Sequence, residues 1–327
     1  MRRREFICIA SGASAWPVVL AAQQPKIMPR IGALLPGAPD SDYGDYFAVF
    51  LKSMRDIGYV AGQNCIIDVA WADGQTDRLA DLAADLVARK VDVVLVSSSL
   101  AANAALKATA TIPIVQASGA SPVGTGAAGS LARPQGNLTG FTNQSEDVSG
   151  KLLELLLTLI PSISRVGVLM VPGAPVTQPQ LKQLRDASET LGIATHSVRI
   201  SKPDALKEAF RELVREKVDG LVVLSAALIV SLSKQIVELA TTARIPAIYP
   251  YPSFAVRGGL MAYGTDHRRQ FQASAKLIHR ILAGTKPADI PIQQPSKLDL
   301  LINLKAANEL GLSVPPTLLA RADEVIE

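Results

Sequence analysis

Short apolar runs alternate with amphipathic segments along this 327-residue chain, and the alternation occurs in two series. The runs of the first series are short and aliphatic, as strands are, and stand at residues 30–35, 65–70, 91–96 and 112–116. Segments with helical spacing separate them, at residues 46–57, 76–88 and 101–109. The run at 91–96 is nearly continuous in apolar residues, which is typical of a strand buried on both faces of a parallel sheet. The pattern predicts right-handed βαβ units.

A stretch rich in Gly, Ala, Ser and Pro, at residues 118–140, interrupts this rhythm. The second series then places strands at residues 166–171, 194–200, 221–224 and 245–249. A further strand at 260–263 and a long helix near 268–282 follow. A chain of this length exceeds one ordinary hydrophobic core. We therefore expect an α/β protein with two doubly wound, Rossmann-like lobes, each built on a parallel sheet.

The N-terminus has the pattern of a secretory signal, since three arginines precede an apolar run from Phe6 to Ala22. The run is shorter than the roughly 20 residues that span a bilayer, and Pro17 interrupts it. The adjacent arginines and Phe6 are similar to a twin-arginine export signal. We expect residues 1–22 to be a cleaved signal peptide and the mature protein to lie in the periplasm.

The charge and the cysteine content of the mature chain argue against a nucleic-acid partner and against a disulfide. Without residues 1–22 it keeps 30 basic and 28 acidic residues, so the net charge falls from +4 to +2. No cluster of Lys and Arg interleaved with aromatics remains, so nucleic acid is not an expected partner. Cys65 is the one mature cysteine, which excludes an intramolecular disulfide. Its place in a predicted strand favours a buried structural thiol.

The sequence contains no residue pattern typical of a catalytic site or a metal site. The three histidines, His196, His267 and His279, are scattered and lack a second ligand at metal-binding spacing. A G-x-G-x-x-G pattern at residues 124–129 follows the fourth strand, whereas a dinucleotide-binding turn follows the first. We therefore expect no catalytic residues, no metal and no cofactor. An NAD-dependent enzyme remains as an alternative.

Several blocks occur in an order that resembles the ABC transporter substrate-binding protein family. They are Ala-Asp-Gly at 72–74, Thr-Ile-Pro-Ile-Val at 111–115, Ser-Leu-Ala-Arg-Pro-Gln-Gly-Asn-Leu-Thr-Gly at 130–140, Gly-Gly-Leu-Met-Ala-Tyr-Gly at 258–264 and the ending at 319–326. The resemblance implies the type I periplasmic binding protein fold and relatives that include tryptophan- and other amino-acid-type receptors. It also implies a monomer that binds a small molecule and works with an ABC permease and ATPase complex. A sensor that serves a signalling partner is the second alternative.

By this resemblance, three crossovers near residues 141–145, 250–253 and 285–291 form a hinge. Lobe 1 would then comprise residues 29–142 and 252–286, and lobe 2 residues 143–251 and 287–327. Open α/β sheets bind ligands beyond the carboxyl ends of their strands. The predicted ligand-binding residues follow strand ends or lie at crossovers: Tyr43, Ser98, Ser99, Ser118, Thr142, Asn143, Pro172, Ser225, Tyr249, Tyr251 and Tyr263.

One departure from the family pattern bears on the ligand. Relatives commonly carry an aspartate just after the strand at 221–224, where this chain has Ser225-Ala226-Ala227. If that acid serves a ligand ammonium, an amino-acid ligand is in doubt here. We expect an amino acid or an aromatic or apolar carboxylate, held by hydroxyl and backbone donors. Tyr251→Ala should weaken its binding without much effect on the melting of the free protein.

Overall fold

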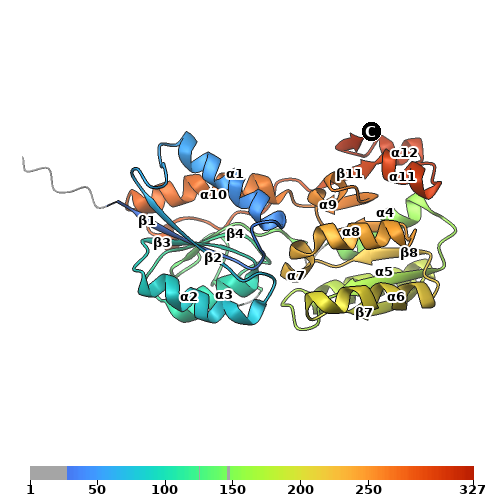
Figure 1. The fold of residues 1–327 in the computed structure, drawn as a ribbon, viewed down its shortest axis with the longest axis horizontal. Helices are drawn as coiled ribbons and strands as arrows, with labels where there is room; N and C mark the ends of the chain where they lie inside the picture. Colours follow the sequence, from blue (N-terminus) through green and yellow to red (C-terminus); the bar gives the residue numbers. More distant parts are fainter. Residues whose placement is uncertain (1–27, 125, 146–147) are drawn as a thin grey trace, which may run out of the picture.

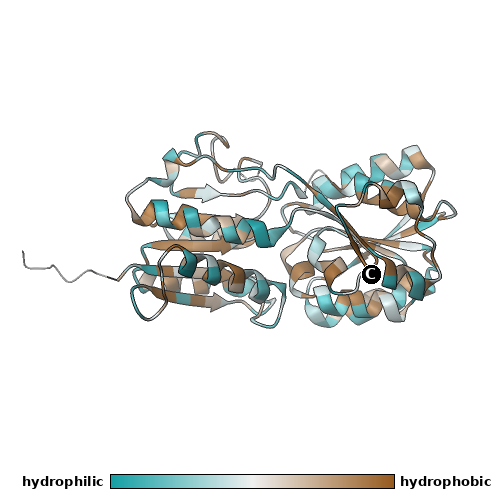
Figure 2. Ribbon diagram, turned by 90° about the horizontal axis from the view of Figure 1, so that it is seen from above, coloured by the Kyte–Doolittle hydropathy of each residue, from teal (hydrophilic) through white to brown (hydrophobic). Residues whose placement is uncertain are grey.

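The computed structural model describes residues 28–124, 126–145 and 148–327, which form two α/β lobes side by side along the long axis of the molecule (Figure 1). The expected signal peptide lies outside the described residues. In both lobes, apolar strands run through the interior and helices with one polar face cover them (Figure 2). The two-lobed α/β architecture predicted from the sequence is confirmed.

Lobe 1 contains a five-stranded parallel sheet in the order β2-β1-β3-β4-β5. Its strands are β1 (Arg30–Leu35), β2 (Ile66–Trp71), β3 (Val93–Ser97), β4 (Ile114–Ser118) and β5 (Leu138–Gly140). All five residues of β3 are buried, as the apolar run indicated. Two layers of helices cover the sheet, α1 (Asp42–Asp56) with α10 (His267–Leu282) and α2 (Leu79–Ala88) with α3 (Ser99–Ala108), while η1 (Thr76–Arg78) leads into α2. Cys65 is buried at the start of β2, and burial raises the pKa of its thiol, as a structural cysteine requires.

Lobe 2 contains a seven-stranded sheet in the order β12-β11-β10-β9-β8-β6-β7. Only the β10–β11 pair is antiparallel among the described strands. The strands are β6 (Arg165–Met170), β7 (Ala194–Arg199), β8 (Gly220–Val223), β9 (Ala247–Tyr249), β10 (Met261–Gly264), β11 (Asp299–Asn303) and β12 (Glu324–Ile326).

Two apolar clusters cover the two faces of this sheet. One cluster includes residues of α4 (Ser149–Leu159), α5 (Thr177–Leu191), α11 (Leu304–Leu310) and α12 (Pro316–Leu319). The other includes residues of α6 (Leu206–Arg215), α7 (Ala227–Ser231), α8 (Ser233–Thr242) and α9 (Pro252–Val256). Short 3-10 turns, η3 (Pro203–Ala205) and η4 (Pro287–Asp289), precede α6 and β11.

The chain crosses between the lobes three times, and the crossing segments are tied together by hydrogen bonds. The Thr142 N–H donates to the carbonyl of Gln293 at 2.9 Å, and Thr265 Oγ1 donates to the carbonyl of Asn143 at 2.8 Å. The three segments therefore form one hinge, after β5, between β10 and α10, and before β11.

Two of the expected crossover positions were wrong. The segment 252–264 belongs to lobe 2, because β10 pairs in parallel with β9. The resemblance placed the second crossover near 250–253, yet Pro252 begins α9, where a missing N–H costs nothing. The third crossing comes after residue 293, since Ile290 still accepts a hydrogen bond from Thr139 of lobe 1 at 2.7 Å.

The two lobes are in contact beyond the hinge. Arg257 of lobe 2 forms an ion pair with Asp42 of lobe 1, and Tyr46 Oη donates to Ser253 Oγ at 2.8 Å. Buried apolar residues of both lobes belong to one continuous cluster. The structure therefore represents a closed arrangement of the lobes.

Candidate functional site

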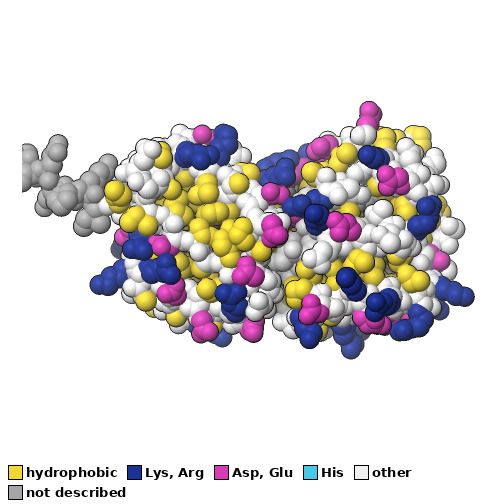
Figure 3. Space-filling view, viewed as in Figure 1, with side chains coloured by type: hydrophobic (Ala, Val, Ile, Leu, Met, Phe, Trp, Pro, Cys, Tyr) yellow, Lys and Arg dark blue, Asp and Glu magenta, His cyan; other side chains and the backbone are white. Residues whose placement is uncertain are grey.

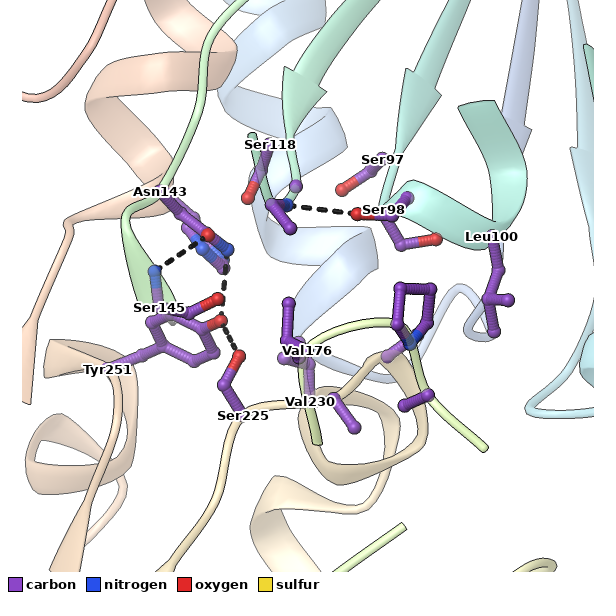
Figure 4. A pocket seen from close by; sticks show the side chains of 18 of the residues that line it. Ser97, Ser98, Leu100, Ser118, Asn143, Ser145, Val176, Ser225, Val230 and Tyr251 are labelled. Atoms are coloured by element: carbon purple, nitrogen blue, oxygen red, sulfur yellow. Dashed lines mark hydrogen bonds between the residues drawn. The ribbon is translucent and has the colours of Figure 1, made fainter. Parts of the chain in front are cut away.

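A cavity lies between the lobes, at the carboxyl ends of strands from both sheets (Figure 4). Lobe 1 and the crossing segments line it with Tyr43, Ser97, Ser98, Ser99, Leu100, Ser118, Gly119, Ala120, Asn143, Ser145 and His267. Lobe 2 lines it with Ala174, Pro175, Val176, Ser225, Ala226, Ala227, Val230 and Tyr251. Because both lobes supply walls, opening the hinge would take the cavity apart.

The start of α3 forms the lobe 1 wall. Ser98, between β3 and α3, has a φ of 100°, a conformation that L-residues rarely adopt, and its Oγ accepts from the N–H of Ala101 at 3.2 Å. Ser99 Oγ accepts from the N–H of Ala120 at 3.0 Å. Both serine hydroxyls therefore hold the loops that shape the cavity. The N–H groups of Ser99 and Leu100, in the first turn of α3, have no acceptor within the described structure and are open to a ligand.

A hydrogen-bond network centred on Tyr251 joins the first crossing to lobe 2 (Figure 4). Asn143 Nδ2 donates to Tyr251 Oη at 3.0 Å, and Tyr251 Oη also bonds to Ser225 Oγ. Ser225 is held in turn by Gln180, whose Oε1 accepts from the Ser225 N–H at 2.8 Å. Tyr251 is only 3% exposed, so its replacement by alanine would leave a cavity that destabilises the free protein. The expectation that this variant melts normally does not fit the structure.

His267 is a polar side chain of the cavity without a partner. It begins α10 and is 4% exposed, with ring centroids 4.1 Å from Tyr251 and 5.4 Å from Tyr46. Neither ring nitrogen has a hydrogen-bond partner within the described residues. Burial lowers the pKa of His267 to about 3, so the imidazole is neutral and offers one donor and one acceptor.

Of the eleven residues predicted from the sequence, seven line this cavity: Tyr43, Ser98, Ser99, Ser118, Asn143, Ser225 and Tyr251. Their contact with a ligand stays a prediction. Each follows a strand end or a crossover, which is where the strand-end rule placed them.

The other four lie outside the cavity lining. Tyr249 stacks on Phe254 at a centroid distance of 5.0 Å inside lobe 2, and Tyr263 packs against the apolar cluster on the sheet's other face. Thr142 is fully buried in the hinge, where its carbonyl accepts from Gln270, and Pro172 is exposed. Tyr249 and Tyr263 lie away from the cavity because a single residue of register decides which face of a strand a side chain takes.

Sequence reasoning missed His267 and the segment 174–176 before α5. The misplaced second crossover concealed His267, because it put the start of α10 deep inside lobe 1. The segment 174–176 follows β6 directly, so the same strand-end rule could have found it had the search extended beyond Pro172.

The described residues contain no group of three or more His, Cys, Asp or Glu side chains that could hold a metal ion. The G-x-G-x-x-G pattern, of which residue 125 lies outside the description, falls in the connection between β4 and β5 and not between a strand and a helix. The described part of the pattern therefore lacks the setting of a dinucleotide-binding turn.

Comparisons with known proteins agree with this geometry. A family model described as ABC transporter substrate binding protein matches residues 45–326. A tyrosine-binding protein of Clostridioides difficile (strain R20291) is 29% identical over 278 residues, which cover 84% of this chain and 80% of the relative. An ABC domain of Streptococcus pneumoniae, solved in complex with L-Trp, is 25% identical with a TM-score of 0.79 and covers 91% of this chain and 99% of its own. A conserved domain protein of Vibrio cholerae is 25% identical with a TM-score of 0.80, and the match covers 91% of this chain and 99% of its own.

Proposed function

Because the chain belongs to the ABC transporter substrate-binding protein family, we propose that it is the exported receptor of an ABC importer. In this role it captures a small organic solute between its lobes and delivers it to a permease. The family consists of substrate-binding proteins, so the chain is not an enzyme. The type I periplasmic binding protein fold is shared with its solved relatives.

The observation that carries the proposal is the cavity shared by the two lobes. Ser98 and Ser118 come from one lobe, Ser225 and Tyr251 from the other, and the hinge joins them. A ligand in such a place binds both lobes only when they are closed, so it favours closure by its differential affinity. Closure then presents a joint surface of the two lobes to the permease.

The chemistry of the walls favours a carboxylate with an apolar or aromatic body. The start of α3 offers backbone N–H groups to an anion, and Leu100, Val176 and Val230 offer apolar surface. Two relatives are described with tyrosine and with L-Trp, each of which has a carboxylate and an aromatic ring.

Location and partners follow from the same role. The N-terminal signal pattern supports export to the periplasm, with residues 1–22 removed. Within the described residues, no helix has the length and apolarity to cross a membrane. The working unit is then a monomer that meets the permease and ATPase complex at the inner membrane.

A thermal-shift screen of the mature protein against amino acids, aromatic acids and short aliphatic acids tests the binding role. A ligand at a hundredfold excess over its dissociation constant stabilises the folded state by about 2.7 kcal/mol. A clear rise in melting temperature, without turnover of the ligand, is expected for at least one compound. A screen in which no compound raises the melting temperature would contradict the proposal.

Reconstitution separates transport from sensing. With the permease and ATPase in vesicles, ligand-loaded receptor should stimulate ATP hydrolysis and uptake, and Arg257→Ala should stimulate less at the same ligand concentration. If the loaded receptor leaves ATP hydrolysis unchanged, the importer role is wrong and the sensor alternative is favoured.

A further inference from the structure

The cavity between the lobes contains no formal charge. None of its lining side chains in the described structure is Asp, Glu, Lys or Arg. Its one histidine, His267, is neutral, since burial lowers its pKa to about 3. A ligand that enters therefore finds no ion-pair partner for either sign of charge. Its charged groups must be stabilised by hydrogen bonds alone.

The acceptors in the described lining of the cavity are all uncharged, and several already accept one hydrogen bond. The carbonyl of Ser118 accepts from the Ser98 N–H at 2.7 Å, and the carbonyl of Gly119 accepts from the Asn143 N–H at 2.8 Å. The carbonyl of Ser225 accepts from Gln180 Nε2 at 3.2 Å. An ammonium group brings three donors and no acceptor, so it would rely on neutral oxygens and on the acceptor nitrogen of His267, with no carboxylate in the described lining to balance its charge.

Donors suited to an anion lie at two places in the cavity, the start of α3 and His267. The N–H groups of Ser99 and Leu100 lack acceptors within the described structure and lie at the positive end of α3, a helix of ten residues. His267, which is 4% exposed and lines the same cavity, has neither ring nitrogen bonded within the described residues and can donate one further hydrogen. A carboxylate is stabilised by such donors without a positive side chain.

From this imbalance we infer that the cavity selects a carboxylate that has no α-ammonium group. The ligand is a short desamino acid whose carboxylate lies at the start of α3 and whose apolar body lies against Val176 and Val230. This inference rests on the proposed function and narrows it, because it separates the organic acids from the amino acids.

Matched ligand pairs test the inference by isothermal titration of the wild-type protein. Each pair differs only by the α-ammonium group: 3-phenylpropanoate with L-phenylalanine, 3-(4-hydroxyphenyl)propanoate with L-tyrosine, and 4-methylpentanoate with L-leucine. We expect at least one desamino acid to bind roughly tenfold or more tightly than its partner, because a buried ammonium without a carboxylate is poorly stabilised.

The outcomes distinguish this inference from the proposed function. If the amino acid of a pair binds as tightly as its desamino partner or more tightly, the inference is overturned while the receptor function stands. If no member of the three pairs binds, the inference is overturned and the proposed carboxylate ligand with it. 2-Phenylethylamine, which lacks the carboxylate, should not bind, and its binding would overturn the placement at α3.

Ser225→Asp provides a second, independent test. Ser225 lies on the lobe 2 wall, away from the start of α3, and an aspartate there would supply the missing partner for an ammonium (Figure 4). Relative to Ser225→Asn, which matches its size without the charge, Ser225→Asp should shift the preference toward the amino acid by roughly tenfold. An unchanged preference in a folded Ser225→Asp protein would contradict the inference. If that variant does not fold, the ligand pairs on the wild-type protein still decide.

Discussion

Replacing Arg257 by alanine should shift the lobes toward the open state. Arg257 follows α9 of lobe 2 and reaches the first turn of α1 in lobe 1, along a seam where basic and acidic side chains face each other (Figure 3). Its guanidinium pairs with Asp42, and its Nη2 lies 2.8 Å from Asp45 Oδ2. The side chain of Asp42 is 1% exposed, that of Arg257 24% and that of Asp45 56%.

The cost of the substitution falls on the closed state. Asp42 is buried in the structure, and Tyr46 Oη, 3.4 Å from its Oδ2, also bonds to Ser253, so removal of Arg257 leaves the carboxylate without its ion-pair partner. Removing one partner of a buried ion pair costs about 3–5 kcal/mol, and the partial exposure of Arg257 reduces this to about 2–3 kcal/mol. Separation of the lobes returns water to Asp42, so the open state avoids the cost. The equilibrium constant for closure should therefore fall by about 30- to 150-fold, and the apparent affinity for the ligand should fall with it.

Isothermal titration with a ligand from the thermal-shift screen measures this loss. Asp45→Asn is the matched control, because its exposed carboxylate contributes less than about 1 kcal/mol. Asp42→Asn combined with Arg257→Ala should recover much of the affinity, since no charge is then left buried. Wild-type affinity in Arg257→Ala, or a double variant as weak as Arg257→Ala alone, would refute the reasoning.

Substitutions at three further positions test the walls of the cavity. In a urea titration, Ser98→Gly should raise the free energy of unfolding by about 1 kcal/mol, because glycine adopts a φ of 100° without strain and the lost cap costs only about 0.3 kcal/mol. Ser98→Ala should lower the free energy of unfolding by about 1 kcal/mol, because it loses the cap and keeps the strain. Tyr251→Phe should weaken ligand binding and lower stability by about 1–2 kcal/mol, because Asn143 and Ser225 lose a shared partner; equal binding by wild type and variant would remove the network from the site. In the unfolded state His267 should bind a proton below about pH 6.5, whereas in the folded state its imidazole stays neutral down to about pH 3. The free energy of unfolding should therefore fall by about 2 kcal/mol between neutral pH and pH 5. His267→Phe should lose this part of the pH dependence.

The sequence allowed the core of each lobe to be predicted because the decisive signal is local. Continuous apolar runs such as 91–96 read as buried strands, and the structure places β3 there with every residue buried. Two of the edge strands, β5 and β12, were not predicted, for the same reason. β5 has three residues and β12 is mostly exposed, so neither has an apolar run to reveal it.

The candidate site was predicted in part. A rule about strand ends proposed Ser98, Ser118 and Ser225, and these residues line the cavity, because strand ends are read from local pattern; their contact with a ligand stays a prediction. It could not show that Ser98 has a positive φ or that the ring nitrogens of His267 have no hydrogen-bond partner among the described residues, because both depend on segments far apart in sequence. The second crossover, placed near 250–253 by resemblance, comes after β10, because the chain first adds α9 and β10 to lobe 2.

Small-angle scattering of the mature protein tests the central claim, that the lobes close on a ligand held between them. The profile should be recorded without ligand and with a titration-verified saturating ligand. We expect the radius of gyration to fall on binding, the liganded profile to match the closed structure with Arg257 on Asp42, and the protein to stay monomeric. Identical profiles for the free and the saturated protein would contradict closure on a ligand.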